Sequence, residues 1–139
     1  ELNQSLTKKK GGRVGMGKIG KEVAKKARAL YLDIFYYGPN KKKINFKYYK
    51  DLKKMAKEVH FLVITCKGGE KTNGIIDQSI INSLRKDAYI INISRGSVIN
   101  EGALLKALEN NTIKGAALEV FNKEPDINPK FKKLKNVIL

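Results

Sequence analysis

The chain has 139 residues, of which 42% are hydrophobic and 30% charged, a balance typical of one globular domain and not of a disordered segment. Its formal charge of +16 is spread over nearly every segment, which is typical of a solvated surface. A single cysteine, a single histidine and the absence of a long apolar run exclude a disulfide framework, a zinc site and a membrane span, and we expect a metal-free cytoplasmic protein.

The glycine run over residues 15–20 leads directly into a predicted helix over residues 21–30. In such a G-x-G-x-x-G loop, Gly15 makes a tight turn, Gly17 lets the backbone approach a pyrophosphate, and Gly20 lets the helix pack near the strand. The start of the helix favours a negative phosphate. Residues 8–14 have almost no apolar side chain where a buried parallel strand needs them, so a plain strand-to-helix turn stays open.

A second strand is predicted over residues 33–37, closed by the turn residues Gly38-Pro39-Asn40. An NAD-binding unit of this kind expects an acidic residue at the end of the strand to hold the ribose hydroxyls, and here Gly38 takes that place. Loss of the carboxylate removes a charge that would repel a 2′-phosphate. The run of Lys41, Lys42 and Lys43 fits a phosphate-binding role and a solvated loop equally well.

The rest of the chain alternates between predicted helices and strands. Helical spacing predicts a helix over residues 51–59, and a continuous apolar run predicts a buried strand over residues 61–66. Then follow a helix capped by Asp77, a strand over residues 88–93, a helix capped by Asn100, a strand over residues 115–121 and the start of another at residue 137. This order predicts an α/β fold, a doubly wound parallel sheet of the Rossmann type with helices on both faces.

His60 and Cys66 stand at opposite ends of one predicted strand. Ligands of such folds bind at the carboxyl ends of strands, so we interpret His60, at the other end, as structural. For Cys66, at the ligand end, the pattern favours the role of a small buried hydrophobe.

Three runs in this order, residues 15–20, 91–98 and 115–125, resemble the coenzyme domain of the D-isomer-specific 2-hydroxyacid dehydrogenases. The resemblance covers nearly the whole chain, from Thr7 to Leu139. Within that family, the segments 36–38, 61–66 and 91–96 are most similar to glyoxylate/hydroxypyruvate reductases, several of which prefer NADPH. The resemblance implies NADP or NAD as cofactor and a small 2-oxo or 2-hydroxy acid as substrate, in a complete enzyme that we expect to be a homodimer. The dispersed charge and the lack of a long apolar run predict no specific nucleic-acid partner and no membrane partner.

The resemblance also implies roles for single residues. Arg95 matches the arginine that binds the substrate carboxylate and polarises the 2-oxo group, and Glu124 matches the glutamate that raises the pKa of the catalytic histidine. Glu119 stands where the family usually has an aspartate near the nicotinamide amide. Cofactor contacts are implied for a larger set: Gly15, Met16, Gly17, Lys18, Ile19, Gly20, Tyr37, Gly38, Lys41, Cys66, Lys67, Thr72, Ile93, Ser94, Arg95 and Glu119.

Several features depart from the family. Gly38 replaces the ribose acid, Lys67-Gly68-Gly69 replaces a Pro-Leu-Thr-like cofactor loop, and the catalytic histidine is expected beyond Leu139. We therefore predict that residues 1–139 are one dinucleotide-binding domain of an oxidoreductase, without its substrate domain and inactive alone. A non-catalytic dinucleotide-binding module and a basic polyanion-binding domain are the alternatives.

Overall fold

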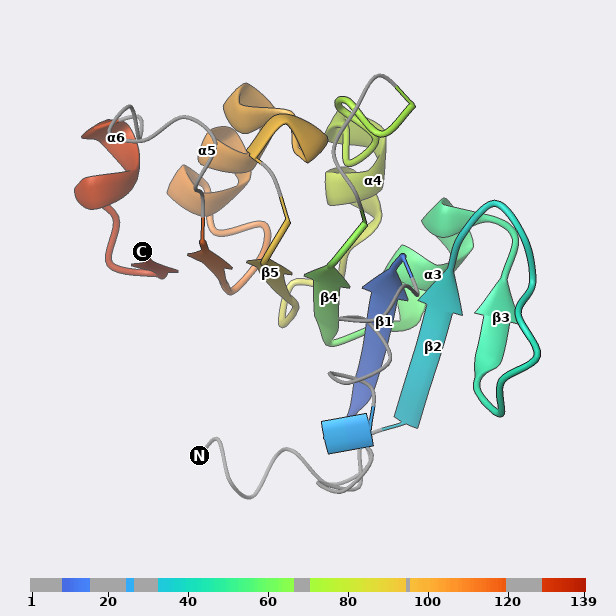
Figure 1. The fold of residues 1–139 in the computed structure, drawn as a ribbon. Coiled ribbons are helices and arrows are strands. Elements are labelled where there is room, and N and C mark those ends of the chain that lie inside the picture. The colour runs from blue at the N-terminus through green and yellow to red at the C-terminus, as the bar shows by residue number, and fades with distance from the viewer. Residues whose placement is uncertain (1–8, 16–24, 27–32, 67–70, 95, 120–128) are drawn as a thin grey trace.

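The structure is a computed structural model that describes residues 9–15, 25–26, 33–66, 71–94, 96–119 and 129–139 (Figure 1). Seven strands in these residues form one sheet in the spatial order β3-β2-β1-β4-β5-β6-β7, and every neighbouring pair is parallel. This is the strand order of a doubly wound dinucleotide-binding fold, extended by one strand, so the predicted fold class is confirmed. The strands are β1 (Lys10–Val14), β2 (Asp33–Tyr37), β3 (Lys47–Tyr49), β4 (Phe61–Ile64), β5 (Tyr89–Asn92), β6 (Gly115–Leu118) and β7 (Val137–Ile138).

Of the four helices whose bounds are described, three lie where the sequence predicts a helix and the last was not predicted. They are α3 (Leu52–Glu58), α4 (Gln78–Ser83), α5 (Glu101–Glu109) and α6 (Pro129–Lys132), with a 3-10 turn η1 (Gly96–Val98) after β5. Both predicted caps are confirmed, because the side chain of Asp77 accepts from the Ile80 N–H at 3.0 Å and that of Asn100 from the Ala103 N–H at 3.0 Å. Helix α4 packs between α3 and α5, and α6 lies beyond α5 (Figure 1).

The hydrophobic core lies between these helices and one face of the sheet. Strand residues such as Leu62, Ile64 and Ile90 are fully buried there against Met55 of α3 and Leu104 of α5. The predicted helix over residues 21–30 lies outside the described residues, apart from Lys25 and Lys26, which are helical. The described helices therefore account for one of the two helical layers that a doubly wound sheet requires.

The first strand is better formed than its composition suggested. Residues 10–14 make β1, which pairs with β2 on one side and β4 on the other. A β carbon on Gly12 would lie only 2.7 Å from Val59 Cγ1 and 3.1 Å from Met55 Cε, so α3 packs directly on the strand backbone. The apolar residue that the pattern lacks is replaced by glycine because the helix leaves no room for a side chain.

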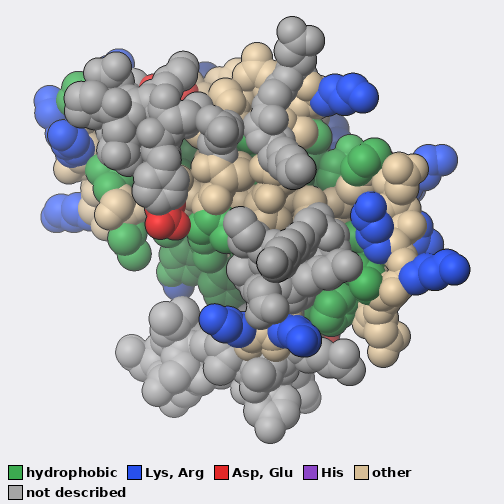
Figure 2. Space-filling model, viewed as in Figure 1, with side chains coloured by type: hydrophobic (Ala, Val, Ile, Leu, Met, Phe, Trp, Pro, Cys, Tyr) green, Lys and Arg blue, Asp and Glu red, His purple; other side chains and the backbone are tan. Residues whose placement is uncertain are grey.

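Two short elements were not predicted, β3 (Lys47–Tyr49) and α6 (Pro129–Lys132). Among the described residues, no helix combines the length and the apolar character needed to cross a bilayer. On the face seen in Figure 2, lysine and arginine side chains lie at several separate places rather than in one patch.

Candidate functional site

The carboxyl ends of the seven parallel strands lie at one edge of the sheet. Backbone hydrogen bonds join neighbouring strands there: the Gly15 N–H donates to the Tyr37 carbonyl at 2.9 Å, and the Glu119 N–H donates to the Asn92 carbonyl at 2.9 Å. The parallel order thus gathers residues from distant parts of the sequence, as predicted. The described candidates within two residues beyond a strand end are Gly15, Gly38, Cys66, Ile93, Ser94 and Glu119.

Gly15 stands where the strand order reverses, between β1 and β4. Its φ is +98°, and a β carbon would lie 2.8 Å from both the backbone N and the Cα of Cys66. Both facts require glycine. A residue with a side chain rarely adopts this φ, and the backbone of Cys66 cannot move aside as a flexible side chain can. This agrees with the tight turn predicted for the first glycine of the run.

A buried arginine in β1, two residues before Gly15, supports this turn. Arg13 is 1% exposed, and its Nη2 donates to Thr65 Oγ1 at 2.8 Å. Thr65 Oγ1 also lies 3.3 Å from the carbonyl oxygens of Val14 and Gly15, to either of which it can donate its single proton. Burial lowers the pKa of Arg13 to about 10, so the guanidinium stays charged at neutral pH. The contact between Arg13 and Thr65 was not predicted from the sequence. The feature that could have indicated it is a charged residue within the strand that precedes the glycine run.

A second turn follows β5. Asn92 is 1% exposed, and its Oδ1 accepts from both the N–H and the hydroxyl of Ser94, each at 2.9 Å. Such an Asx turn fixes the backbone at the end of the strand, three residues before Arg95. Asn92 was not singled out from the sequence, where it stood as one more residue of an apolar strand.

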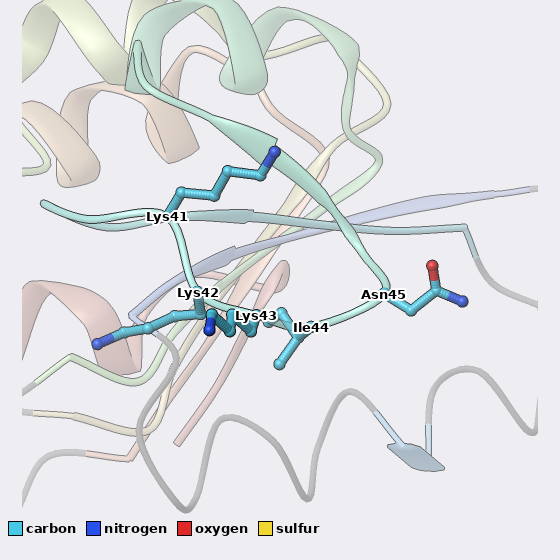
Figure 3. A pocket seen from close by; sticks show the side chains of 5 residues that line it. All are labelled: Lys41, Lys42, Lys43, Ile44 and Asn45. Carbon is cyan, nitrogen blue, oxygen red and sulfur yellow. The ribbon is translucent and has the colours of Figure 1, made fainter.

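The loop between β2 and β3, residues 38–46, is named here the basic loop. Its lysines Lys41, Lys42 and Lys43 are exposed, and with Ile44 and Asn45 they line an open hollow in which the side chains point in different directions (Figure 3). At the start of the loop, Gly38 is half-buried and has nothing within 4 Å of its β position. The structure therefore has room for a larger group beside Gly38.

Cys66 and Thr72 lie in the connection after β4. Cys66 is half-buried against the core, and burial raises the pKa of its thiol, which agrees with the role of a small hydrophobe. The carbonyl of Thr72 accepts from the Ile75 N–H at 3.2 Å, and the Gly74 N–H donates to the Ser97 carbonyl at 2.8 Å. The connection after β4 is thus fastened to the turn after β5.

His60 lies at the amino end of β4, away from this edge. Its Nδ1 accepts from the Lys10 N–H at 3.0 Å, and burial is the main cause that lowers the pKa of His60. Its position and this hydrogen bond agree with the structural role predicted for it.

Eight of the predicted site residues lie outside the described residues, and their roles stay predictions. They are Met16, Gly17, Lys18, Ile19, Gly20, Lys67, Arg95 and Glu124.

Comparison with known families agrees with this geometry. Residues 1–139 match the family described as D-isomer specific 2-hydroxyacid dehydrogenase, NAD binding domain. The chain is 38% identical over 139 residues to a 2-ketogluconate reductase of Gluconobacter oxydans, an alignment that covers 99% of this chain and 45% of that protein.

Two solved structures are similar to the fold described above. The NADPH-dependent glyoxylate/hydroxypyruvate reductase of Sinorhizobium meliloti, in complex with NADP and malonate, has a TM-score of 0.93 and 32% identity over 97% of this chain and 43% of that one. The 2-hydroxyacid dehydrogenase of Ketogulonicigenium vulgare has a TM-score of 0.89 and 34% identity over 96% and 42%. The chain spans less than half the length of these relatives.

Proposed function

Because this chain belongs to the D-isomer specific 2-hydroxyacid dehydrogenase family, as its NAD-binding domain, we propose that it is the coenzyme-binding part of an oxidoreductase acting on a small 2-oxo or 2-hydroxy acid. In this proposal residues 1–139 form a single dinucleotide-binding domain, and the substrate domain is built from other residues of the complete enzyme. A substrate like glyoxylate or hydroxypyruvate is supported by the similar Sinorhizobium meliloti reductase, which is named for those two compounds.

The observation that carries the proposal is the backbone of Gly15. The space that a side chain would need is closed by Cys66, at the crevice where doubly wound folds bind dinucleotides. A turn without a side chain lets a pyrophosphate approach the backbone, so the residues present fit a nicotinamide dinucleotide. The bound cofactor supplies the hydride, and the protein supplies binding and orientation.

For the choice of cofactor, we propose that NADP(H) binds at least as well as NAD(H). Gly38 brings no carboxylate to repel a 2′-phosphate, and its β position is open. Lys41, Lys42 and Lys43 follow in the same loop and supply positive charge. Since these lysines are exposed, the contribution of the 2′-phosphate should weaken as salt is added.

For catalysis, we propose that Arg95 binds the carboxylate of the substrate and that Glu124 supports the proton donor of the complete enzyme. Arg95 comes directly after the Asx turn of Asn92, and Glu124 follows β6 by six residues. The parallel order of β5 and β6 supports a cleft shared by the two side chains. A fixed, always charged guanidinium suits a carboxylate because it can donate two parallel hydrogen bonds.

Calorimetry with NADP⁺ and NAD⁺ at low ionic strength tests this proposal. We expect both dinucleotides to bind the 139-residue chain, NADP⁺ at least as tightly as NAD⁺, and Gly17→Val to block the approach of the pyrophosphate. Replacing Lys41, Lys42 and Lys43 with Gln should remove the advantage of NADP⁺. Equal dinucleotide affinity for the parent and a folded Gly17→Val variant would place the site elsewhere, and an NAD⁺ preference that the lysine variant leaves unchanged would refute the proposed cofactor choice.

We further propose that the complete enzyme is a cytoplasmic homodimer. One cysteine in 139 residues suits a reducing compartment, and the family resemblance supports the dimer. Sedimentation of the complete enzyme tests the oligomeric state, and a monomer at micromolar concentration would contradict it.

A further inference from the structure

Two tyrosines from neighbouring strands lie side by side beneath the basic loop. Tyr36 of β2 pairs in register with Tyr48 of β3, so their side chains share one face of the sheet. Their ring centroids are 5.0 Å apart with an interplanar angle of 47°. Tyr36 is fully buried, which fixes its hydroxyl against the loop.

Both hydroxyls are bonded to the backbone of that loop. Tyr36 Oη accepts from the Lys42 N–H at 2.9 Å and donates to the Lys42 carbonyl at 3.2 Å, so it holds both polar backbone groups of one residue. Tyr48 Oη donates to the Gly38 carbonyl at 2.7 Å. The loop is thus fastened at its first residue and again in the middle of its three lysines.

We propose that Tyr36 and Tyr48 are positioning residues that set the cofactor preference, by holding the basic loop in place to receive the 2′-phosphate of NADP(H). This inference rests on the proposed function, which puts the adenine ribose beside Gly38. A loop of nine residues loses conformational freedom when it closes on a ligand, and that loss weakens binding. Because the tyrosines hold the loop backbone before the cofactor arrives, less of this freedom remains to be lost.

The effect should be specific to the 2′-phosphate. NAD(H) has no group that requires the lysines of the loop, so its affinity should not depend on the two hydroxyls. NADP(H) meets exposed, flexible lysine side chains, whose reach depends on where their backbone is held (Figure 3). A tyrosine that only stabilised the fold would weaken both dinucleotides equally.

Tyr49 provides a matched control within the same strand. It follows Tyr48 directly, so its side chain points to the opposite face, where its ring contacts Phe35 at 5.5 Å between centroids. Its hydroxyl donates to Glu58 Oε2 at 2.7 Å. Tyr49→Phe therefore removes one tyrosine hydroxyl and one hydrogen bond from β3, as Tyr48→Phe does, without a change in the described contacts of the basic loop.

The experiment measures the Kd of NADP⁺ and of NAD⁺ for the parent chain and for Tyr36→Phe, Tyr48→Phe and Tyr49→Phe, at low ionic strength. We expect the ratio of the NAD⁺ Kd to the NADP⁺ Kd to fall about threefold to tenfold in Tyr36→Phe, the effect of a lost hydrogen bond, with the NAD⁺ Kd unchanged. Tyr48→Phe should lower the ratio in the same direction. Tyr49→Phe should leave it as in the parent.

Two outcomes would overturn the inference while the proposed cofactor choice stands. One is a ratio that stays at the parent value in both Tyr36→Phe and Tyr48→Phe, and the other is an equal fall in Tyr49→Phe. If Tyr36→Phe does not fold, the half-buried Tyr48 decides the question through Tyr48→Phe. Binding of 2′,5′-ADP and 5′-AMP to the parent tests the proposed cofactor choice separately from the inference about the tyrosines. A parent that binds both compounds equally has no 2′-phosphate site, and then the cofactor choice and this inference fail together.

Discussion

Replacement of Gly15 by alanine is the sharpest test of the glycine turn. At a φ of +98°, an alanine carries backbone strain of about 1–3 kcal/mol. Its β carbon would also lie 2.8 Å from backbone atoms of Cys66, and forced overpacking of this kind adds about 1–3 kcal/mol. The chain can relieve this only by moving the end of β1 away from β4, which changes the crevice itself.

Gly11→Ala is the matched control. Gly11 lies in the same strand, has no positive φ, and its β carbon would make an ordinary contact of 3.8 Å with Ile34 Cδ1. Urea unfolding and titration with NADP⁺ of both variants separate strain from binding. We expect Gly15→Ala to lower the free energy of unfolding by at least about 1 kcal/mol and to weaken dinucleotide binding by at least about tenfold, whereas Gly11→Ala changes neither by as much.

Parent-like stability and parent-like affinity in Gly15→Ala would refute this reasoning, because the alanine would then have found room that the structure excludes. A large loss of stability with unchanged affinity would refute only the expected loss of dinucleotide binding. In that case the turn would matter for folding but not for the cofactor.

Three further predictions use the same kind of comparison. Gly12→Ala should lower the free energy of unfolding in urea by about 1–3 kcal/mol, more than Gly11→Ala, since α3 packs on Gly12. Tyr49→Phe should raise the pKa of Glu58, because the Tyr49 hydroxyl is the main cause that lowers it. The stability held by this lowered pKa is present above the pKa of the unfolded chain and is lost as the pH falls through the folded value, so NMR titration and acid unfolding should show a smaller loss on acidification in the variant than in the parent. His60 has a pKa below 6.5, so stability should fall as the pH drops below 6.5 in the parent and less steeply in His60→Gln, as urea unfolding between pH 8 and 5 would show.

Much of the fold could be predicted because its signals are local. Apolar runs and turn residues gave the strand Asp33–Tyr37 with the bounds found in the structure, and side-chain caps marked the starts of α4 and α5 at Asp77 and Asn100. Strand β3 was missed because three residues, Lys47–Tyr49, are too few to show an alternating pattern. Pairing with β2 stabilises this strand, and pairing is not visible in a local window.

The composition of the first strand, β1, could not be explained from the sequence. Gly11, Gly12 and Arg13 looked unsuited to a central strand, because parallel strands are normally apolar on both faces. The structure explains Gly12 by the helix that packs on it and Arg13 by its bond to Thr65, 52 residues away. Both reasons are tertiary contacts that composition and periodicity do not contain.

The candidate site, like the fold, could be predicted in part from the sequence. The rule that ligands bind at the carboxyl ends of parallel strands placed Gly15, Gly38 and Glu119 at one edge. The side chains that hold the turns of that edge were not predicted. The sequence does not indicate whether a hydroxyl such as that of Tyr36 forms its hydrogen bond within the core, within the sheet or to a loop. Only the structure shows that it bonds to the backbone of Lys42.

The last prediction is that the 139-residue chain binds a dinucleotide but does not reduce glyoxylate or hydroxypyruvate by itself. Its single histidine, His60, precedes the four residues of β4, which puts it about 13 Å from the carboxyl edge at about 3.3 Å per residue. The hydrogen bond from the Lys10 N–H to Nδ1 holds the ring at the amino end of β4, so this imidazole does not reach a substrate at the carboxyl edge. Loss of general acid and base help costs about 10²–10⁴-fold in rate, before any loss of substrate positioning.

A spectrophotometric assay of NADPH oxidation tests this prediction, with binding of NADPH measured in the same samples. His60→Gln in the complete enzyme is the control, and it should keep turnover while it removes the one histidine of this chain. Reduction of either 2-oxo acid by the 139-residue chain would refute the argument, and so would a loss of turnover in a folded His60→Gln enzyme. The first result would require a proton donor among residues 1–139, and the second would require His60 to act from the edge where the structure does not put it.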